Sequence, residues 1–83
     1  MTLTCEMSWK ASMITWSKDG EQLSHADDTR VNISSTVRAH LTQTHLVVKS
    51  VATNDSGEYT CGAEDDSGYH FTDSINITIK SKL

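Results

Sequence analysis

The residues of this chain best suited to binding a metal ion are its histidines and cysteines. Two histidines form a metal site most readily when they lie four residues apart on a helix or two apart on one strand, because both rings then face one ion. The four histidines have no such spacing: they are His25, His40, His45 and His70. We therefore expect no metal and no cofactor.

Serine and threonine hydroxyls are the other groups that could react. No serine lies in a nucleophile elbow, no histidine and aspartate are arranged to activate one, and no glycine-rich phosphate loop occurs. The abundance of these residues instead fits strand faces that contact water. We expect the chain to bind and not to catalyse.

The charge pattern excludes several classes of partner. The formal net charge is −4 and the lysines and arginines are scattered singly, so no basic stripe exists for nucleic acid or for an anionic membrane surface. No apolar run approaches the roughly 20 residues of a transmembrane helix, so this domain should not insert into a membrane. Residues 1–5 lack the charged start and apolar stretch of a secretory signal, so if the parent protein is secreted, the chain is a piece of it.

The length predicts a single domain over residues 1–83, with a thin core, because a domain of this size buries only about 60–65% of its unfolded surface. A hydrophobic content of 36% is low, so the core needs a supplement. Apolar and polar residues alternate with period two in short runs, which predicts six or seven strands. These runs lie at residues 2–7, 13–18, 30–35, 45–51, 59–63 and 75–80.

Two local signals separate the strands. The Asp19-Gly20 pair predicts a hairpin turn, because this dipeptide tolerates positive φ. Residues 50–56 could form a short helical turn. Short strands at regular spacing, with no helical stripe and no proline, indicate an all-β sandwich or barrel.

One segment narrows the fold to a family. Residues 55–61 read Asp-Ser-Gly-Glu-Tyr-Thr-Cys, which resembles the D-x-G-x-Y-x-C motif of the immunoglobulin superfamily. Cys5 lies upstream and Trp16 follows it by a strand-and-loop spacing, as in true immunoglobulin domains. Leu46, Val48 and Val51 match the family's fifth strand. The resemblance covers nearly the whole chain and implies an immunoglobulin-like, two-sheet, antiparallel Greek-key sandwich.

The resemblance also implies a disulfide and the residues around it. Cys5 and Cys61 would form a disulfide that joins the two sheets across the core. Trp16 would pack against this disulfide, and Leu46 would face the core beside it. Tyr59, two residues before the second cysteine, would place its hydroxyl against upstream backbone, as in the tyrosine corner.

Three further motif residues have expected roles at the lower end of the sandwich. Asp55 would accept hydrogen bonds from Arg30, a pair common in this family. Gly57 would permit the tight turn into the sixth strand. All these roles are architectural, so they fix the fold and leave the function open.

The motif and the short hairpin around Asp19 look like the intermediate (I-set) type. This type builds cell-adhesion molecules, receptor ectodomains and the basigin, neuroplastin and embigin group, and also intracellular titin-like muscle proteins. The segment between Arg30 and His45 is longer than in the shortest I-set domains, which leaves room for a C2-type assignment.

The family's first strand, which normally precedes the strand of the first cysteine, is missing or truncated here. Its absence would leave the backbone edges of residues 2–7 and 75–80 unpaired, and such edges recruit other strands. We expect an edge-strand dimer or strand exchange at high concentration. Lys80 and Lys82 are edge charges that resist such pairing.

Three N-x-S/T sequons favour secretion. They begin at Asn32, Asn54 and Asn76. Asn32 and Asn76 fall on the outward parity of their strands, which suits a glycan. Asn54 overlaps the structural Asp55 and suits one least.

Two surface features could carry binding. Glu64, Asp65 and Asp66 form a compact acidic patch at one end of the sandwich, unless they are only a solvated hairpin tip. Trp9 lies in or near a loop at the same end and could be an exposed anchor. It also continues the parity of Cys5 and Met7, so it could instead cover the core.

The sequence therefore predicts an extracellular or cell-surface recognition module of a receptor or adhesion protein. Its partner would be another protein or another copy of the same domain. The alternative is a structural spacer domain of an intracellular titin-like muscle or cytoskeletal protein, in which the cysteines can stay reduced.

Overall fold

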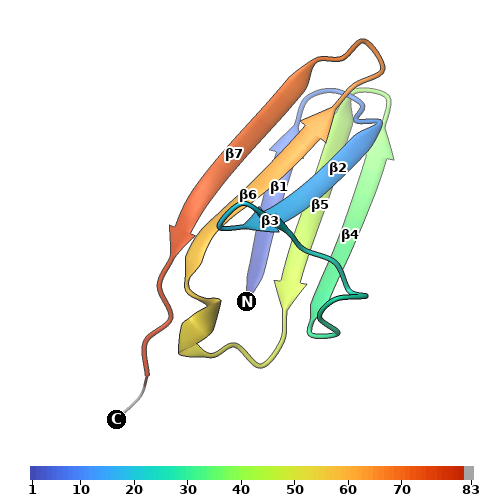
Figure 1. Ribbon diagram of the computed structural model, residues 1–83. Coiled ribbons are helices and arrows are strands. Elements are labelled where there is room, and N and C mark those ends of the chain that lie inside the picture. The colour runs from blue at the N-terminus through green and yellow to red at the C-terminus, as the bar shows by residue number, and fades with distance from the viewer. Residues whose placement is uncertain (82–83) are drawn as a thin grey trace.

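The computed structural model describes residues 1–81 and contains seven strands and one 3₁₀ helix (Figure 1). Lys82, expected above as an edge charge, lies outside the described residues, as does the last residue of the expected 1–83 domain. The elements are β1 (Thr2–Met7), β2 (Met13–Lys18), β3 (Glu21–Gln22), β4 (Val31–Arg38), β5 (Leu41–Val48), η1 (Thr53–Asp55), β6 (Gly57–Glu64) and β7 (His70–Ile77).

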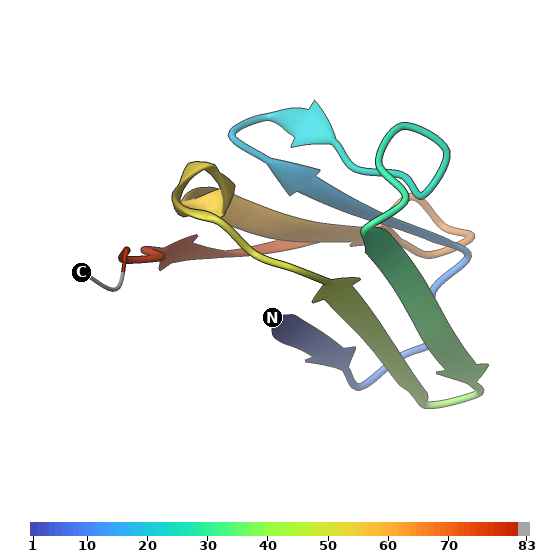
Figure 2. The same cartoon turned by 90° about the horizontal axis from the view of Figure 1, so that it is seen from below.

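The strands form two antiparallel sheets that pack as two layers (Figure 2). One sheet has the order β1-β5-β4 and the other has the order β3-β2-β6-β7. The chain crosses between layers after β1, β3 and β5, whereas β2 and β3, β4 and β5, and β6 and β7 are neighbours in sequence that pair within one sheet. The predicted immunoglobulin-like sandwich is confirmed.

The core lies between the sheets around a disulfide that joins Cys5 on β1 to Cys61 on β6. Trp16, which is 2% exposed, Tyr59 and Leu46 are buried around it. Their strands show the expected alternation: in β5, Leu46 and Val48 are buried while the neighbouring His45 is only partly so.

Two buried threonines, which no sequence pattern indicated, complete the core. Thr42 and Thr44 on β5 are fully buried. The Thr42 hydroxyl donates to the backbone oxygen of Trp9 at 2.7 Å and accepts from the backbone N–H of Ala11 at 2.9 Å. The Thr44 hydroxyl accepts from Trp16 Nε1 at 2.9 Å. These bonds satisfy polar groups that would be costly to bury alone.

The turn signals are confirmed. Asp19 and Gly20 both have positive φ, 51° and 86°, and form the two-residue turn between β2 and β3. The helical turn expected in residues 50–56 is η1. Gly57 begins β6 beside this hairpin, and a Cβ atom there would lie 2.6 Å from Asp19 Oδ2. The absence of a side chain lets Asp19 approach and accept the backbone N–H of Glu58 at 2.9 Å.

The strand boundaries differ from the prediction where polar residues dominate. The strand predicted over 75–80 runs instead from His70 to Ile77, and the one predicted from Arg30 to Ser35 extends to Arg38. Both are edge strands of their sheets. Because an edge strand is only partly covered, it can form from polar residues that show no apolar alternation. For the same reason Ile33 and Ile75, which face inward by register, remain 39% and 51% exposed.

Substitution of Trp16 by alanine should destabilise the protein by about 3–5 kcal/mol, because it empties the centre of a thin core. Denaturant unfolding followed by circular dichroism measures this loss. The control is Met13→Ala, which removes an exposed side chain and should change stability by less than about 0.5 kcal/mol. A loss below about 1 kcal/mol for Trp16→Ala would show that Trp16 does not organise the core.

Candidate functional site

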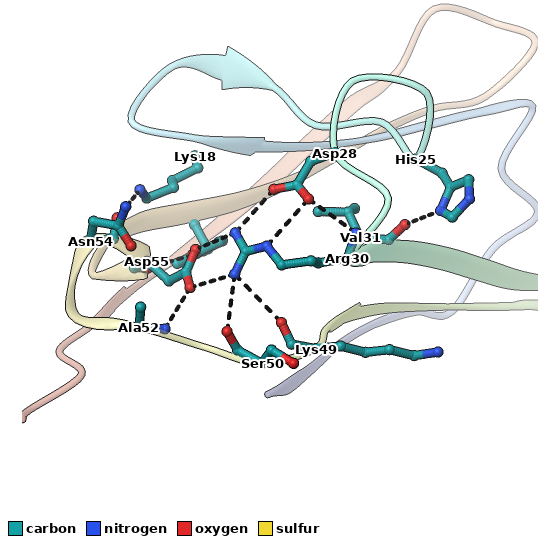
Figure 3. Close-up of polar contacts among 11 residues, drawn as sticks. Lys18, His25, Asp28, Arg30, Val31, Lys49, Ser50, Ala52, Asn54 and Asp55 are labelled. Carbon is teal, nitrogen blue, oxygen red and sulfur yellow. Dashed lines mark hydrogen bonds and ion pairs between the residues drawn. The ribbon is translucent and has the colours of Figure 1, made fainter. Parts of the chain in front are cut away.

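The sandwich has two ends, and the lower one in Figure 1 holds an ion-pair network centred on Arg30 (Figure 3). The Arg30 guanidinium donates to both carboxylate oxygens of Asp55, each at 2.9 Å. It also donates to Asp28 at 3.0 Å and to the backbone oxygen of Ser50 at 3.2 Å. Arg30 precedes β4 and Asp55 precedes β6, so this pair connects segments leading into different sheets.

Asp55 is held in its charged form by these contacts. Its carboxylate is buried, yet the hydrogen bonds from Arg30, with a further bond from the backbone N–H of Ala52 at 2.8 Å, lower its pKa to about 2. The hydrogen bonds to Asp55 and Asp28 raise the pKa of Arg30, and the bonds that Asp28 accepts from Arg30 lower the pKa of Asp28. Tyr59 donates its hydroxyl to the backbone oxygen of Asp55, and burial raises the pKa of that hydroxyl. Because these groups satisfy one another, the lower end is built for stability.

The opposite end is different, because it presents large side chains to solvent. The ring of Trp9, in the β1–β2 connection, contacts that of Tyr69, in the β6–β7 loop, edge to face with centroids 5.4 Å apart. Trp9 is half-buried and packs against the core, whereas Tyr69 is 56% exposed. Trp9 thus covers the core, as one interpretation expected, and contacts a second aromatic residue that is open to solvent.

The three residues of the predicted acidic patch, Glu64, Asp65 and Asp66, make different contacts in the structure. Asp65 Oδ1 accepts from the backbone N–H groups of Ser67 and Tyr69, both at 2.9 Å, and from the Ser67 hydroxyl at 2.7 Å. These hydrogen bonds, of which the one from the Ser67 side chain has the largest effect, lower the pKa of Asp65 and hold the loop in shape. Glu64 lies 3.1 Å from His70 Nε2. Asp66 is exposed and makes no side-chain hydrogen bond within residues 1–81.

Sequence reasoning missed three residues at this end. Met13 begins β2 and is 57% exposed, Tyr69 is the last residue of the β6–β7 loop, and His70 begins β7. Between Met13 and His70 a shallow groove of about 180 Å³ crosses the outer face of the sheet over Gly62, which has no side chain to fill it. Their exposure depends on register and on the shape of the loop, which no local pattern reveals. We call this surface, formed by Trp9, Met13, Glu64, Tyr69 and His70, the aromatic end.

The three sequon asparagines are all exposed. Asn32 lies on β4 opposite Val47, and Asn76 lies on β7 opposite Glu58, so they project from the outer faces of different sheets. Asn54 lies in η1, where its backbone oxygen accepts from Lys18 Nζ at 2.6 Å.

Within residues 1–81, no group of three or more histidine, cysteine or acidic side chains is arranged to hold a metal ion. Over the same residues, no helix has the length and apolar character needed to cross a bilayer.

The two-sheet topology, the disulfide between the sheets and the tryptophan beside it together define an immunoglobulin-like domain. The family profile described as "Immunoglobulin I-set domain" matches residues 1–79, and the chain belongs to this family. This match favours the I-set over the C2-type assignment.

Two curated relatives are neural cell adhesion molecules. The chain is 35% identical over 69 residues to neural cell adhesion molecule 1 of Homo sapiens, which covers 82% of the chain and 8% of the relative. It is 30% identical over 69 residues to neural cell adhesion molecule 1 of Bos taurus, with 82% and 7% coverage. The chain therefore spans less than a tenth of the length of either relative.

The contact between Arg30 and Asp55 should stabilise the fold in a pH-dependent way. Since the pKa of Asp55 falls from 3.8 to about 2 on folding, its stabilisation is complete above about pH 4 and is lost as pH falls through about 2, a change of about 2 kcal/mol. Urea unfolding of the wild type and Asp55→Asn between about pH 7 and pH 1.5 tests this, because the difference between them should shrink over that window.

A double-mutant cycle supplies the control for direct contact. At about pH 7, Arg30→Ala and Asp55→Ala should each destabilise, and the double variant should lose less than the sum of both. Strict additivity, or a difference that does not change with acid, would contradict the ion pair.

Proposed function

We propose that this I-set domain is an extracellular protein-recognition module of a cell-surface receptor or adhesion protein, and that it acts by binding and not by catalysis. The observation that carries the proposal is its similarity, over 82% of the chain, to a protein named a neural cell adhesion molecule. The disulfide supports an oxidising compartment, because cytosolic thiols are normally kept reduced.

The aromatic end is the surface we assign to recognition. Tyrosine, tryptophan and methionine are enriched at protein interfaces, where a few large anchors carry most of the binding energy. Tyr69 is positioned by the loop bonds of Asp65 and by its contact with Trp9, so a partner would meet a side chain that is already ordered. Less ordering on binding leaves more of the contact energy as affinity.

The partner we propose is a protein, including a second copy of this domain. The groove over Gly62 lies beside the exposed Met13 side chain, so an apolar side chain of the partner can enter where Gly62 has none. Glu64 and His70, whose side chains lie 3.1 Å apart at its rim, supply polar contacts around that apolar centre.

We also propose glycans on Asn32 and Asn76, and none on Asn54. The first two side chains leave opposite outer faces of the sandwich, away from the aromatic end. Asn54 is adjacent to Asp55, whose carboxylate must stay in contact with Arg30, and its own backbone is held by Lys18.

Expression in secretory cells behind an added signal peptide tests the extracellular assignment. Mass analysis without reducing agent should show the loss of two protons for the Cys5–Cys61 bond and glycan mass that disappears in an Asn32→Gln, Asn76→Gln double variant. Asn54→Gln is the control and should change nothing. A reduced, unmodified chain would support the intracellular spacer instead.

Bead aggregation tests recognition by the aromatic end. Beads coated with the chain through a biotin at its C-terminus should aggregate, and Tyr69→Ala combined with Met13→Ala should weaken the interaction about tenfold or more, because hot-spot truncations each cost about 2 kcal/mol. Val51→Ala, an exposed apolar residue beyond β5, is the matched control. Equal aggregation of all three proteins would rule out this surface.

A further inference from the structure

A second surface, separate from the aromatic end, is the outer edge of β4 (Figures 1 and 2). β4 is the last strand of the sheet β1-β5-β4, and within residues 1–81 it pairs only with β5. In the immunoglobulin fold the strand that precedes β1 joins this sheet beside β1, on the side away from β4. The open edge of β4 is therefore a property of the fold and does not depend on where the sequence begins.

The backbone groups of β4 alternate between those that bond to β5 and those that point away from it. The backbone oxygen of Arg30, just before β4, accepts from the N–H of Lys49 at 3.0 Å, so the even-numbered residues of β4 are the ones that bond to β5. Val31 points the other way: its N–H donates to the backbone oxygen of Asp28 at 3.0 Å, and its own oxygen is hydrogen-bonded to His25 Nδ1 at 2.8 Å (Figure 3). Within residues 1–81 the later residues of this set have no such contacts; they are Ile33, Ser35 and Val37.

The same three residues lie on the inner face of the strand, opposite buried residues of β5. Ile33 and Val37 are 39% and 42% exposed, because β4 has no neighbour on this side. Between them, the Ser35 hydroxyl donates to Thr44 Oγ1 at 2.9 Å, which fixes the centre of the strand to the core. The edge is therefore ordered, open, and apolar at two positions.

This edge lacks the features by which natural edge strands prevent pairing, which are short length, proline, a bulge or an inward-pointing charge. β4 runs for eight residues without proline and pairs with β5 without interruption. Its one charged residue, Arg38, is at its last position and by register lies on the outer face. β3, an edge strand of the other sheet, is by contrast only two residues long. β4 is thus suited to pairing with a further strand.

A second copy of β4 is complementary to this edge in an antiparallel pair centred on Ser35. Ile33 then lies opposite Val37 of the second copy, and Val37 opposite its Ile33. The three open residues of each copy exchange hydrogen bonds with those of the other, so that every open N–H and C=O group is paired. On the outer face Arg38 lies opposite Asn32, so no like charges meet.

The neighbouring registers are poorer. A shift of two residues in one direction places Val37 opposite Val31, whose backbone groups already bond to Asp28 and His25. A shift of two residues in the other direction places Ile33 opposite Ala39, which lies in the β4–β5 turn. Only the register centred on Ser35 uses all the open residues of both copies.

We propose that the β4 edge binds the β4 edge of a second copy of this chain, which joins the two three-stranded sheets into one continuous sheet. Ile33 packs against Val37 at two equivalent places, and the two Ser35 residues meet at the two-fold axis. The proposal concerns the chain in which Asn32 carries no glycan, since a glycan there would stand beside Arg38 of the second copy.

This arrangement leaves the aromatic end free. Because the paired strands are antiparallel, the two aromatic ends lie at opposite ends of the dimer and remain open to a partner. The edge-strand dimer expected from the sequence is thereby assigned to β4 instead of residues 2–7 and 75–80.

The first test uses the disulfide-bonded, non-glycosylated chain at about 0.01 to 1 mM, a range over which a weak dimer becomes populated. Sedimentation equilibrium measures the dissociation constant, and amide hydrogen exchange locates the contact. Exchange should slow with concentration at the open amides of Ile33, Ser35 and Val37. The amides of Ser34 and Thr36, which already bond to β5, are the internal control and should change less.

Paired charges test the register. Ile33→Lys and Val37→Glu should each weaken self-association about tenfold or more, because each change is repeated in two cross-strand pairs. An equal mixture of these two variants should associate about threefold or more tightly than an equal mixture of Ile33→Lys and Ile33→Glu. Both mixtures contain the same charges, but only the first places lysine opposite glutamate. Circular dichroism should show all three variants folded, because both side chains are partly exposed.

Three results would overturn the proposal. The first is a chain that stays monomeric throughout this range, and the second is protection of a strand edge other than β4. The third is equal association of the two mixtures. Should a variant fail to fold, the exchange measurement on the wild type still decides. The aromatic-end variants lie outside β4, so this proposal and the proposed function can fail separately.

Discussion

The structure depends on holding two thin sheets face to face. Backbone hydrogen bonds lie within each sheet, so the association of the layers rests on side chains and on one covalent bond. That bond joins Cys5 to Cys61 across 56 residues, and closing a loop of this length removes roughly 4 kcal/mol of unfolded-state entropy in the chain-entropy account. The disulfide thereby gives a domain with few apolar residues stability that its thin core cannot supply.

Three sets of side-chain hydrogen bonds also hold the two layers together, one in the middle of the sandwich and one at each end. Trp16 on one sheet donates to Thr44 on the other in the middle of the core. Arg30 and Asp55 connect the layers at the lower end. At the upper end, Thr42 bonds the backbone of the β1–β2 connection at Trp9 and Ala11. The loop that carries Trp9 is thereby fixed to the core, and Tyr69 is in turn positioned against Trp9. The proposed recognition surface is thus ordered by interactions that also stabilise the fold.

Much of the fold could be predicted because its key residues act locally or through a motif of fixed spacing. The alternation around Leu46 predicted the inward face of β5, and the Asp19-Gly20 pair predicted a turn. Both features depend only on residues that are close in sequence. Asp55 and Tyr59 lie within seven residues of Cys61, inside one recognisable segment. The buried threonines could not be predicted, because a threonine is tolerated inside only when a distant residue supplies its hydrogen bond.

The candidate sites were predicted less well for a related reason. Trp9 and the acidic patch were found by residue type, but Tyr69 and Met13 became candidates only when the loop and register placed them together. Asp73 lies outside the strand that the sequence predicted over residues 75–80. Its position opposite Cys61 on the inner face of β7 is a property of the pairing with β6.

The disulfide also determines how the domain responds to tension along the chain. Cys5 lies near one end of the sequence and Cys61 is in the sixth strand, so the bond encloses most of the sandwich in a closed covalent loop. A force pulling on the two ends is carried through this bond and bypasses residues 6–60. Only the flanking segments, residues 1–4 and 62–81, can then lengthen, at about 3.3–3.6 Å per residue. In its oxidised form the domain can therefore release only these flanking segments under tension, whereas reduction of the disulfide would free residues 6–60 as well.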